Sequence, residues 1–265
     1  MKKINKSSPP NALTKFASSN PTALWDRDFR SHQSGASYKS VRNTMIQDQG
    51  GLCGYCEKEI HLLPEHKQRV EHYHNKSDKA DPTINWGLDW DNVFAVCLGG
   101  SEISAEKKKQ YPLPGNLSCD AHKEHMVRKK LLPEACEGYF LNPLKIVATP
   151  CLFGFDKSNG KLSANKIACD TLADVDNQYC SIQKLVEETI KILNLNCDRL
   201  CADRLEILKS YNQEVAKARK ANDRQGLSKL AKRWFNNEWP SFFTTRRILL
   251  GKHAEEFLDN SVYDG

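Results

Sequence analysis

The sequence predicts a mainly helical protein of the α+β class, and three observations carry that prediction. Strand-like residues are confined to short runs, chiefly between residues 69 and 98. Apolar residues recur at helical spacing along much of the chain after Asp176. Four cysteines flank the strand-like runs, with a spacing typical of metal ligands. We therefore expect a small thiol-rich unit that contains the strands, followed by a helical region.

Residues 1–36 are predicted to form an N-terminal arm. The first 22 residues are polar and contain three prolines, so we expect an extended segment that forms no core. A helix follows from Ser37 to Gln49, because apolar residues repeat there at helical spacing and Ser37 can cap its start. Gly50 and Gly51 end this helix, since glycine adopts the left-handed C-cap conformation at little cost.

The region between residues 69 and 130 is predicted to run strand, loop, strand, helix. Branched and aromatic residues favour the strands, and Asp81-Pro82 lies in the polar loop between them. Gly99-Gly100 ends the second strand, and a lysine-rich insertion follows at residues 101–116. The four elements are expected at residues 69–73, 75–90, 92–98 and 119–130.

The second half of the chain is predicted to hold a hairpin and then helices. Residues 151–156 and 161–164 form the hairpin, because Asn159-Gly160 favours a tight turn. Apolar stripes after Asp176 predict helices, and Pro240 is expected to interrupt a final helical pair.

Composition and charge place the chain among cytoplasmic proteins. A membrane span needs about 18 or more apolar residues in a row, and no such run is present. The basic start is followed by no apolar signal segment, so the ten cysteines are expected to be reduced. The net charge of +6 is compatible with a nucleic-acid partner.

A structural zinc site is the prediction for four of the cysteines. Cys53 and Cys56 form a close pair, and Cys97 and Cys119 would form the second pair, with the lysine-rich insertion looped out between them. Structural zinc takes four such ligands in a tetrahedron. The alternative is that Cys97 and Cys119 are unrelated buried thiols.

Glu71 and His72 are the candidates for chemistry. A carboxylate binds a hard divalent cation through oxygen, and a neutral imidazole accepts a proton from water. His74 replaces His72 as the base if the strand register differs by two residues. Arg69 and Lys76 are candidate phosphate contacts, with a solvated loop as the alternative.

These segments, taken in order, resemble the HNH endonuclease family with its structural zinc. The likeness rests on Cys53-x2-Cys56, Val70-Glu71-His72, the run from Trp90 to Cys97, and Cys119-Asp120-Ala121-His122-Lys123. The phrase from Gly51 to Glu57 resembles in particular the PtuB-like HNH proteins of Septu-type and retron-associated anti-phage systems.

The resemblance implies a ββα-metal core with structural zinc in residues 37–135. His72 would be the general base, Glu71 would bind a catalytic Mg²⁺ or Mn²⁺, and Asn92 would orient the loop and base or help to hold the metal. The family often ends in Cys-His-x-x-Lys, whereas this chain has Asp120 at the histidine position. Asp120 is therefore the first candidate to complete the metal site and His122 the second, and Lys123 is a candidate nucleic-acid contact.

The resemblance also implies a function. The chain would be a metal-dependent effector of anti-phage defence that hydrolyses phosphodiester bonds of DNA or of structured RNA such as tRNA. It would work with a PtuA-like ATPase docked on residues 136–265, and the retron likeness adds a reverse transcriptase and its msDNA as candidate partners. This chain has no phosphate-binding loop of its own.

Two other functional classes are compatible with the same residues. One is a non-catalytic module that is stabilised by structural zinc and binds nucleic acid through basic helices. The other is a thiol redox protein that uses Cys53 and Cys56. Substitution of His72 separates these classes, because it would abolish the activity of a nuclease and leave nucleic-acid binding or thiol redox activity intact.

Overall fold

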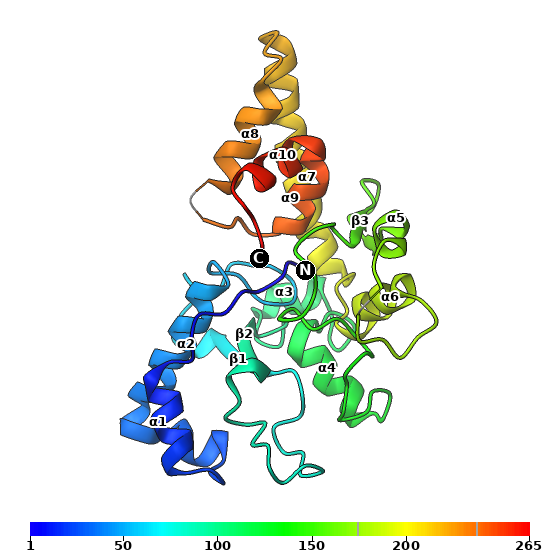
Figure 1. Cartoon of the computed structure of the whole chain (residues 1–265). Helices are drawn as coiled ribbons and strands as arrows, with labels where there is room; N and C mark the ends of the chain where they lie inside the picture. The colour runs from blue at the N-terminus through cyan, green and yellow to red at the C-terminus, as the bar shows by residue number, and fades with distance from the viewer. Residues whose placement is uncertain (174, 237) are drawn as a thin grey trace.

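The fold is mainly helical, with two small antiparallel sheets, as the sequence predicts. The computed structural model describes residues 1–173, 175–236 and 238–265 (Figure 1). The four strands are β1 (Gln68–His72), β2 (Val93–Cys97), β3 (Phe153–Phe155) and β4 (Leu162–Ala164). The α-helices of the described residues are α1 (Asn11–Ser19), α2 (Ala36–Asp48), α3 (Ala105–Gln110), α4 (Cys119–Arg128), α5 (Lys166–Asp170), α6 (Ile182–Ile192), α7 (Asp198–Lys220), α8 (Gly226–Phe235), α9 (Phe243–Leu250) and α10 (Lys252–Asn260). Shorter helical turns are η1 (Trp25–Phe29), η2 (His32–Gly35), η3 (Glu65–Lys67) and η4 (Trp90–Asn92).

The sheet of β1 and β2 is the centre of the first half of the chain. The two strands pair antiparallel, with Glu71 opposite Phe94 and His72 opposite Val93. Every residue of β2 is buried, because α2 and α4 both contact this strand. Two strands alone are marginal in water, so these helices supply the apolar cover that the pair needs. The predicted order of strand, loop, strand and helix is confirmed.

The N-terminal 36 residues are not an extended arm. They contain α1, whose Leu13 and Phe16 are buried, and η1, whose Trp25 and Phe29 are buried as well. The rings of Phe16 and Phe29 lie 5.2 Å apart. Apolar residues spaced by three and four therefore build core here, in a segment whose prolines and polar residues masked the pattern.

Helix α2 begins and ends close to the predicted positions. Gly35 precedes it with φ +86°, and Ser37 lies inside the helix, where its hydroxyl faces His32 Nδ1 at 2.8 Å rather than capping the start. Gly50 and Gly51 end the helix with φ values of +63° and +80°, as predicted.

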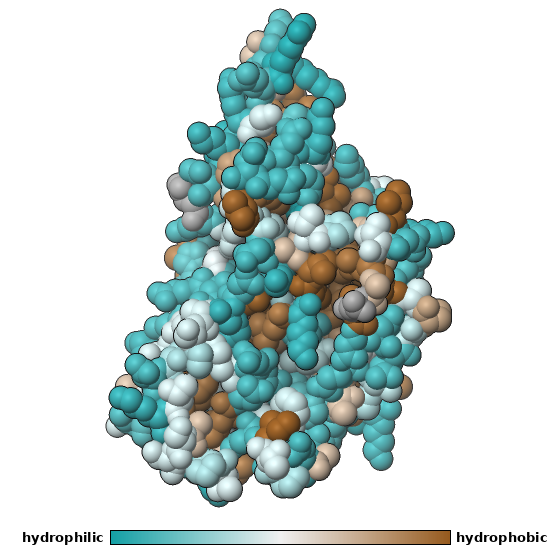
Figure 2. Space-filling model, in the orientation of Figure 1, coloured by the Kyte–Doolittle hydropathy of each residue, from teal (hydrophilic) through white to brown (hydrophobic). Residues whose placement is uncertain are grey.

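The C-terminal half contains the predicted hairpin and more helix than expected. Strands β3 and β4 pair antiparallel around the turn that ends at Gly160. Helices α7 and α8 form a hairpin that projects from the body (Figure 1), and its surface is mostly hydrophilic (Figure 2). Pro240 separates α8 from α9 as expected, but a third helix, α10, follows after Gly251.

Both ends of the chain lie near the middle of the molecule (Figure 1). The amino group of Met1 is buried, forms an ion pair with Glu57 Oε1 at 3.1 Å and donates to Thr244 Oγ1 at 3.0 Å. Asn5 Nδ2 donates to Asp264 Oδ1 at 2.6 Å. The N-terminal segment therefore joins the thiol-rich unit to the C-terminal helices.

None of the helices in the described residues combines the length and the apolar character that crossing a lipid bilayer would require.

Candidate active site

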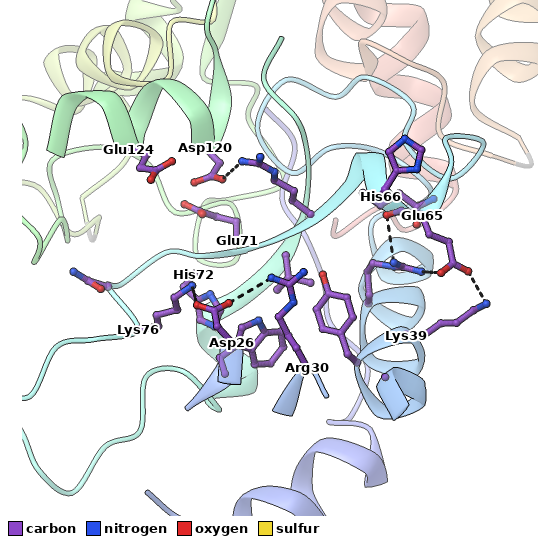
Figure 3. A pocket seen from close by; sticks show the side chains of 18 of the residues that line it. Asp26, Arg30, Lys39, Glu65, His66, Glu71, His72, Lys76, Asp120 and Glu124 are labelled. Atoms are coloured by element: carbon purple, nitrogen blue, oxygen red, sulfur yellow. Dashed lines mark hydrogen bonds and ion pairs between the residues drawn. The ribbon is translucent and has the colours of Figure 1, made fainter. Parts of the chain in front are cut away.

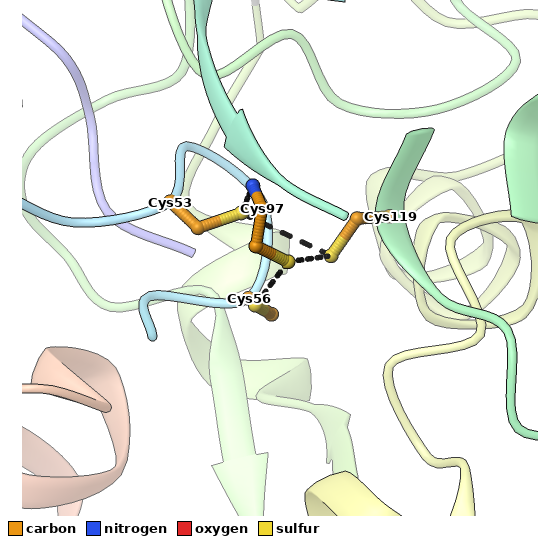
Figure 4. Close-up of side chains that lie close together, drawn as sticks. All are labelled: Cys53, Cys56, Cys97 and Cys119. Carbon is orange, nitrogen blue, oxygen red and sulfur yellow. Dashed lines mark hydrogen bonds between the residues drawn. The ribbon is translucent and has the colours of Figure 1, made fainter. Parts of the chain in front are cut away.

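The four predicted cysteine ligands meet at one buried point (Figure 4). Their sulfur atoms all lie within 4.8 Å of one another. The Cys56–Cys97, Cys97–Cys119 and Cys53–Cys119 Sγ–Sγ distances are 3.7, 3.8 and 3.9 Å. Four sulfurs at about 2.3 Å from a tetrahedral zinc ion would be about 3.8 Å apart. The donor set and its spacing thus fit zinc, and the alternative of unrelated thiols at Cys97 and Cys119 is excluded.

Each thiol is placed by a turn or by the end of an element. Cys53 and Cys56 lie in the turn after α2, Cys97 ends β2, and Cys119 begins α4. Gly99 lets β2 and α4 approach, because a Cβ atom there would lie 2.1 Å from the carbonyl oxygen of Ser118. Gly99 also has φ +59°, which favours glycine.

Positive charge and backbone N–H groups surround the thiol cluster. The backbone N–H groups of Cys97 and Gly99 donate to Cys53 Sγ at 3.3 Å and to Cys97 Sγ at 3.4 Å. The guanidinium of Arg199, from α7, is buried near the thiols of Cys56, Cys97 and Cys119. Four thiolates on a divalent ion leave two net negative charges, so these groups offset an electrostatic cost of burial.

Glu71, His72 and Asp120 line a single cleft of about 1160 Å³ (Figure 3). Glu71 Oε1 accepts hydrogen bonds from Tyr55 Oη at 3.0 Å and from Lys123 Nζ at 2.6 Å. Burial and the neighbouring Glu71 carboxylate raise the pKa of Asp120 to about 8. Two carboxylates this close repel unless a proton or a cation lies with them. The pair can therefore hold a hard divalent cation.

His72 has the geometry of a neutral base. Its Nε2 lies 3.1 Å from the carbonyl oxygen of Gly87, which can only accept, so Nε2 carries the proton and Nδ1 is the acceptor. Burial lowers the pKa of His72 to about 4, and its ring lies nearly perpendicular to that of Trp25, at 85°, with the centroids 4.9 Å apart. The ring is therefore neutral at pH 7. Because β1 ends at His72, this residue and Glu71 both reach the cleft although they are adjacent in the chain.

Asn92 does not line that cleft. Its Oδ1 accepts from the backbone N–H of His74 at 2.7 Å, and its Nδ2 donates to the carbonyl oxygens of His74 and Trp86 at 3.0 and 2.8 Å. These bonds tie the ends of the loop between the strands together. Asn92 borders a second cavity of about 380 Å³ and does not share a pocket with Glu71, His72 and Asp120, so of its two expected roles this geometry fits the orientation of the loop and not the holding of the metal.

The two alternative histidines point elsewhere. His122 Nδ1 lies 2.7 Å from the carbonyl oxygen of Ile192, in α6, and His122 is not among the residues that line the cleft. His74 lies between Glu137 Oε1 at 2.6 Å and Asp78 Oδ2 at 2.7 Å and stacks on Trp86, at the second cavity. Neither geometry places an imidazole beside Glu71.

The three candidate nucleic-acid contacts have different surroundings. Lys123 is buried, and its ammonium donates to Glu71 Oε1 and to the carbonyl oxygens of His72 and Tyr73, so it is not free to contact a substrate. Arg69 and Lys76 both line the cleft. Arg69 lies 3.6 Å from Asp120 Oδ2, and Lys76 lies 2.6 Å from Asp26 Oδ2.

One wall of the cleft comes from residues that the sequence analysis did not single out. They belong to η1, to α2 and to the segment before β1. The charged and aromatic members of this wall are Trp25, Asp26, Arg30, Tyr38, Lys39, Arg42, Glu65 and His66. The sequence does contain a sign of this wall, because Tyr38 and Arg42 are four residues apart and so share a face of the predicted helix.

Comparison with known proteins gives one informative relative. No protein-family model matches the chain. A curated protein from Escherichia coli, named "Retron Ec83 putative HNH endonuclease", is 37% identical to this chain over 251 residues, which is 94% of each of the two chains.

Proposed function

The chain belongs to the HNH endonuclease family, and from that premise we propose that it hydrolyses phosphodiester bonds with a divalent cation, in the cytoplasm, as an effector of anti-phage defence. The observation that carries the proposal is the meeting of Glu71, Asp120 and a neutral His72 in one cleft. An activated water and a cation beside the scissile phosphate are what such hydrolysis needs.

His72 would act as the general base. Its Nδ1 takes a proton from a water molecule as the water oxygen forms a bond to phosphorus, and the bond from phosphorus to the leaving oxygen breaks. The carbonyl oxygen of Gly87 then accepts from an imidazolium, a stronger hydrogen bond than that from a neutral ring. A base of this kind contributes about 100- to 10,000-fold to a rate.

Glu71 and Asp120 would hold the cation. Mg²⁺ or Mn²⁺ bound there would stabilise the charge that develops on the phosphoryl and leaving oxygens. Lys123 positions Glu71 through its 2.6 Å contact, which leaves the other carboxylate oxygen available. Asn92 would act as a positioning residue that shapes the loop behind His72.

The thiol cluster would hold structural zinc. Its four ligands join the turn after α2, the end of β2 and the start of α4, which carries Asp120. Four sulfur ligands leave no open position for substrate, so this ion would take no part in the reaction.

The defence role rests on the family resemblance and on the name of the relative, which places that protein with a retron. For this chain we propose the same setting, with a PtuA-like ATPase and a retron reverse transcriptase with its msDNA as partners. Residues 136–265 offer the docking surface, since the α7–α8 hairpin projects from the body (Figure 1). The substrate is DNA or structured RNA such as tRNA.

A cleavage assay tests the proposal. The purified chain is incubated with Mg²⁺ or Mn²⁺ and with DNA or tRNA, alone and with the ATPase partner. We expect His72→Ala to lose at least about 100-fold in rate. His253→Ala is the matched control in the arm without the ATPase, because this histidine lies in α10, contacts Ser228 and does not line the cleft. Equal cleavage by His72→Ala and the parent would contradict the assigned base, and binding without any cleavage would favour the non-catalytic module.

A further inference from the structure

The charges around the cleft are divided between two sides. Figure 3 shows the carboxylates of Glu71, Asp120 and Glu124 gathered on one side, and on the other Arg30 beside Asp26 and Lys39 beside Glu65. The acidic side is the proposed cation site. The basic side is built by η1 and α2, and nothing in the proposed chemistry uses it.

Tyr38 lies between two guanidinium groups on the basic side. The Arg30 and Arg42 guanidinium carbons are 5.1 and 5.7 Å from the centre of its ring. Such cation–π contacts hold both cations in fixed orientations. We call these three residues the arginine wall.

Arg42 is buried with an unused donor. The residue is 4% exposed, and its Nε has no hydrogen-bond partner. Its other polar contacts are long, at 3.3 Å to Glu65 Oε2, 3.4 Å to the Glu65 carbonyl oxygen and 3.5 Å to Asn43 Oδ1. Lys39 lies 2.5 Å from the same carboxylate, so two cations share one acid. Burial of a charged donor without a partner costs free energy, and an anion in the cleft would remove that cost.

Arg30 is also poorly neutralised. Its ion-pair partner is Asp26 at 3.6 Å, and Asp26 is held more closely by Lys76 at 2.6 Å. The side chain of Arg30 is 54% exposed, so its planar set of N–H donors is open to a ligand. A guanidinium binds the oxygens of a phosphate in pairs.

The backbone adds a third feature on this side. Helix α2 has 13 residues and no side-chain cap, and Ser34, Gly35 and Ala36 at its start line the cleft. The N-terminus of a helix favours an anion through its free N–H groups and its dipole. The dipole of α2 therefore reinforces the two arginines.

We propose that the arginine wall binds a backbone phosphate of the nucleic-acid substrate, next to the phosphodiester that is cut. This inference rests on the proposed function, because it takes the acidic side as the place of cleavage. Arg30 and Arg42 act as binding residues that set the position of the strand, while His72 performs the proton transfer. Loss of the wall therefore raises KM and leaves kcat nearly unchanged.

A binding measurement with a labelled oligonucleotide tests the wall. The probes are a short fluorescein-labelled DNA duplex and a labelled RNA hairpin, and anisotropy is followed at several salt concentrations with the His72→Ala chain, so that no cleavage occurs. Adding Arg30→Gln is expected to weaken binding about 10-fold and to reduce the slope of log K against log salt by about 0.8, the effect of one lost phosphate contact. In the chain with His72 intact, Arg30→Gln raises KM by a similar factor.

Arg27→Gln is the matched control. Arg27 is in the same turn, its side chain is 75% exposed and paired with Asp28, and it does not line the cleft. Arg42→Lys serves as a second variant, since it keeps the charge and removes the planar donors; thermal unfolding reports whether it folds. We expect it to weaken binding without lowering zinc content.

Three outcomes overturn the proposal: equal affinity and salt slope for Arg30→Gln and Arg27→Gln, loss of kcat without loss of binding, or failure of the His72→Ala chain to bind either probe. The proposed function is judged separately, by cleavage. A parent chain that binds through Arg30 but cuts neither substrate would refute the nuclease proposal and retain the phosphate site.

Discussion

At the scale of single residues, Asp120 and His122 differ in where α4 directs them. They are two positions apart, so the helix turns their side chains to nearly opposite sides. Asp120 reaches the cleft beside Glu71, and His122 reaches the Ile192 carbonyl oxygen. From the sequence, Asp120 ranks first and His122 second, but the sequence could not show which side chain reaches the cleft, because the Ile192 carbonyl oxygen that His122 contacts lies 70 residues away in the chain.

Substitution of Asp120 and substitution of His122 are expected to have different effects: the first on the cleavage rate and the second on stability. Asp120→Asn removes a cation ligand, so we expect cleavage to fall about 100-fold at fixed Mg²⁺, with partial recovery at higher Mg²⁺. His122→Asn is expected to leave the rate within about threefold and to lower the free energy of unfolding by about 1 kcal/mol, since it weakens one hydrogen bond. Steady-state cleavage and urea unfolding of both variants are the measurements. A larger loss of rate in His122→Asn would move the cation site to His122.

Asn92 and Lys123 show the limit of motif reasoning at this scale. A motif gives the residue type and the order along the chain, and the resemblance assigns both residues a place in the family pattern on that basis alone. Their partners come from the fold: the loop backbone for Asn92, and Glu71 with two carbonyl oxygens for Lys123. The sequence could not show that the side-chain donors and acceptors of Asn92 and Lys123 are already engaged in hydrogen bonds within the fold.

At the scale of elements, strands and helices with strong patterns were predictable and the weakly patterned ones were not. Strands β1 and β2 and helix α4 lie where the sequence puts them, since branched residues and the thiols mark their positions. Helix α1 was missed because its apolar residues, Leu13 and Phe16, are few and follow two prolines. Helix α10 was not predicted: the expected final pair of helices lies on either side of Pro240, and α10 follows α9 after Gly251.

The junction of β2 and α4 depends on Gly99. Gly99 lies between Cys97 and Cys119 in the chain, and a methyl group on it would collide with Ser118. An alanine at this position would also have to adopt a positive φ. We expect Gly99→Ala to lower the free energy of unfolding by about 3 kcal/mol and to reduce zinc retention. Denaturant unfolding and metal analysis are the measurements.

Gly35→Ala is the matched comparison for that variant. Gly35 also has positive φ, at +86°, but its nearest neighbour to an added Cβ is 3.6 Å away. We therefore expect Gly35→Ala to lower the free energy of unfolding by only about 1 kcal/mol, the conformational cost of a positive φ, and to leave the zinc content unchanged. Equal destabilisation by the two variants would show that the contact with Ser118 has no separate effect.

At the scale of the whole molecule, the thiol cluster and the N-terminal segment join parts that are distant in sequence. The sequence predicted the cluster, because close cysteine pairs have a metal-binding spacing. It did not predict that residues 1–36 contribute to one wall of the cleft, since contacts such as the one between Trp25 and His72 join residues that are far apart in the chain. The cleft is therefore a property of the complete fold rather than of residues 37–135 alone.

Removal of zinc should affect the entire chain. We expect about one zinc per molecule, and a strong chelator should abolish cooperative unfolding and cleavage together, because structural zinc sites supply about 10 kcal/mol of folding free energy. Cys97→Ser should behave like the chelated protein, and Cys180→Ser, at an exposed thiol, should behave like the parent. Metal analysis and calorimetry measure both. Full stability in a zinc-free sample would argue against a metal at the four thiols.

The adjacency of Cys119 and Asp120 has a consequence for biosynthesis. The last of the four clustered thiols and the second proposed cation ligand are neighbours in the chain, and the ribosome makes them seconds after Cys53 and Cys56 at about 5–20 residues per second. A nascent chain that has passed only β1 carries His72 and Glu71 but neither a closed metal centre nor Asp120. An unfinished polypeptide is thus expected to be harmless to the messenger and transfer RNAs around it, and nucleolytic competence arises in one late event.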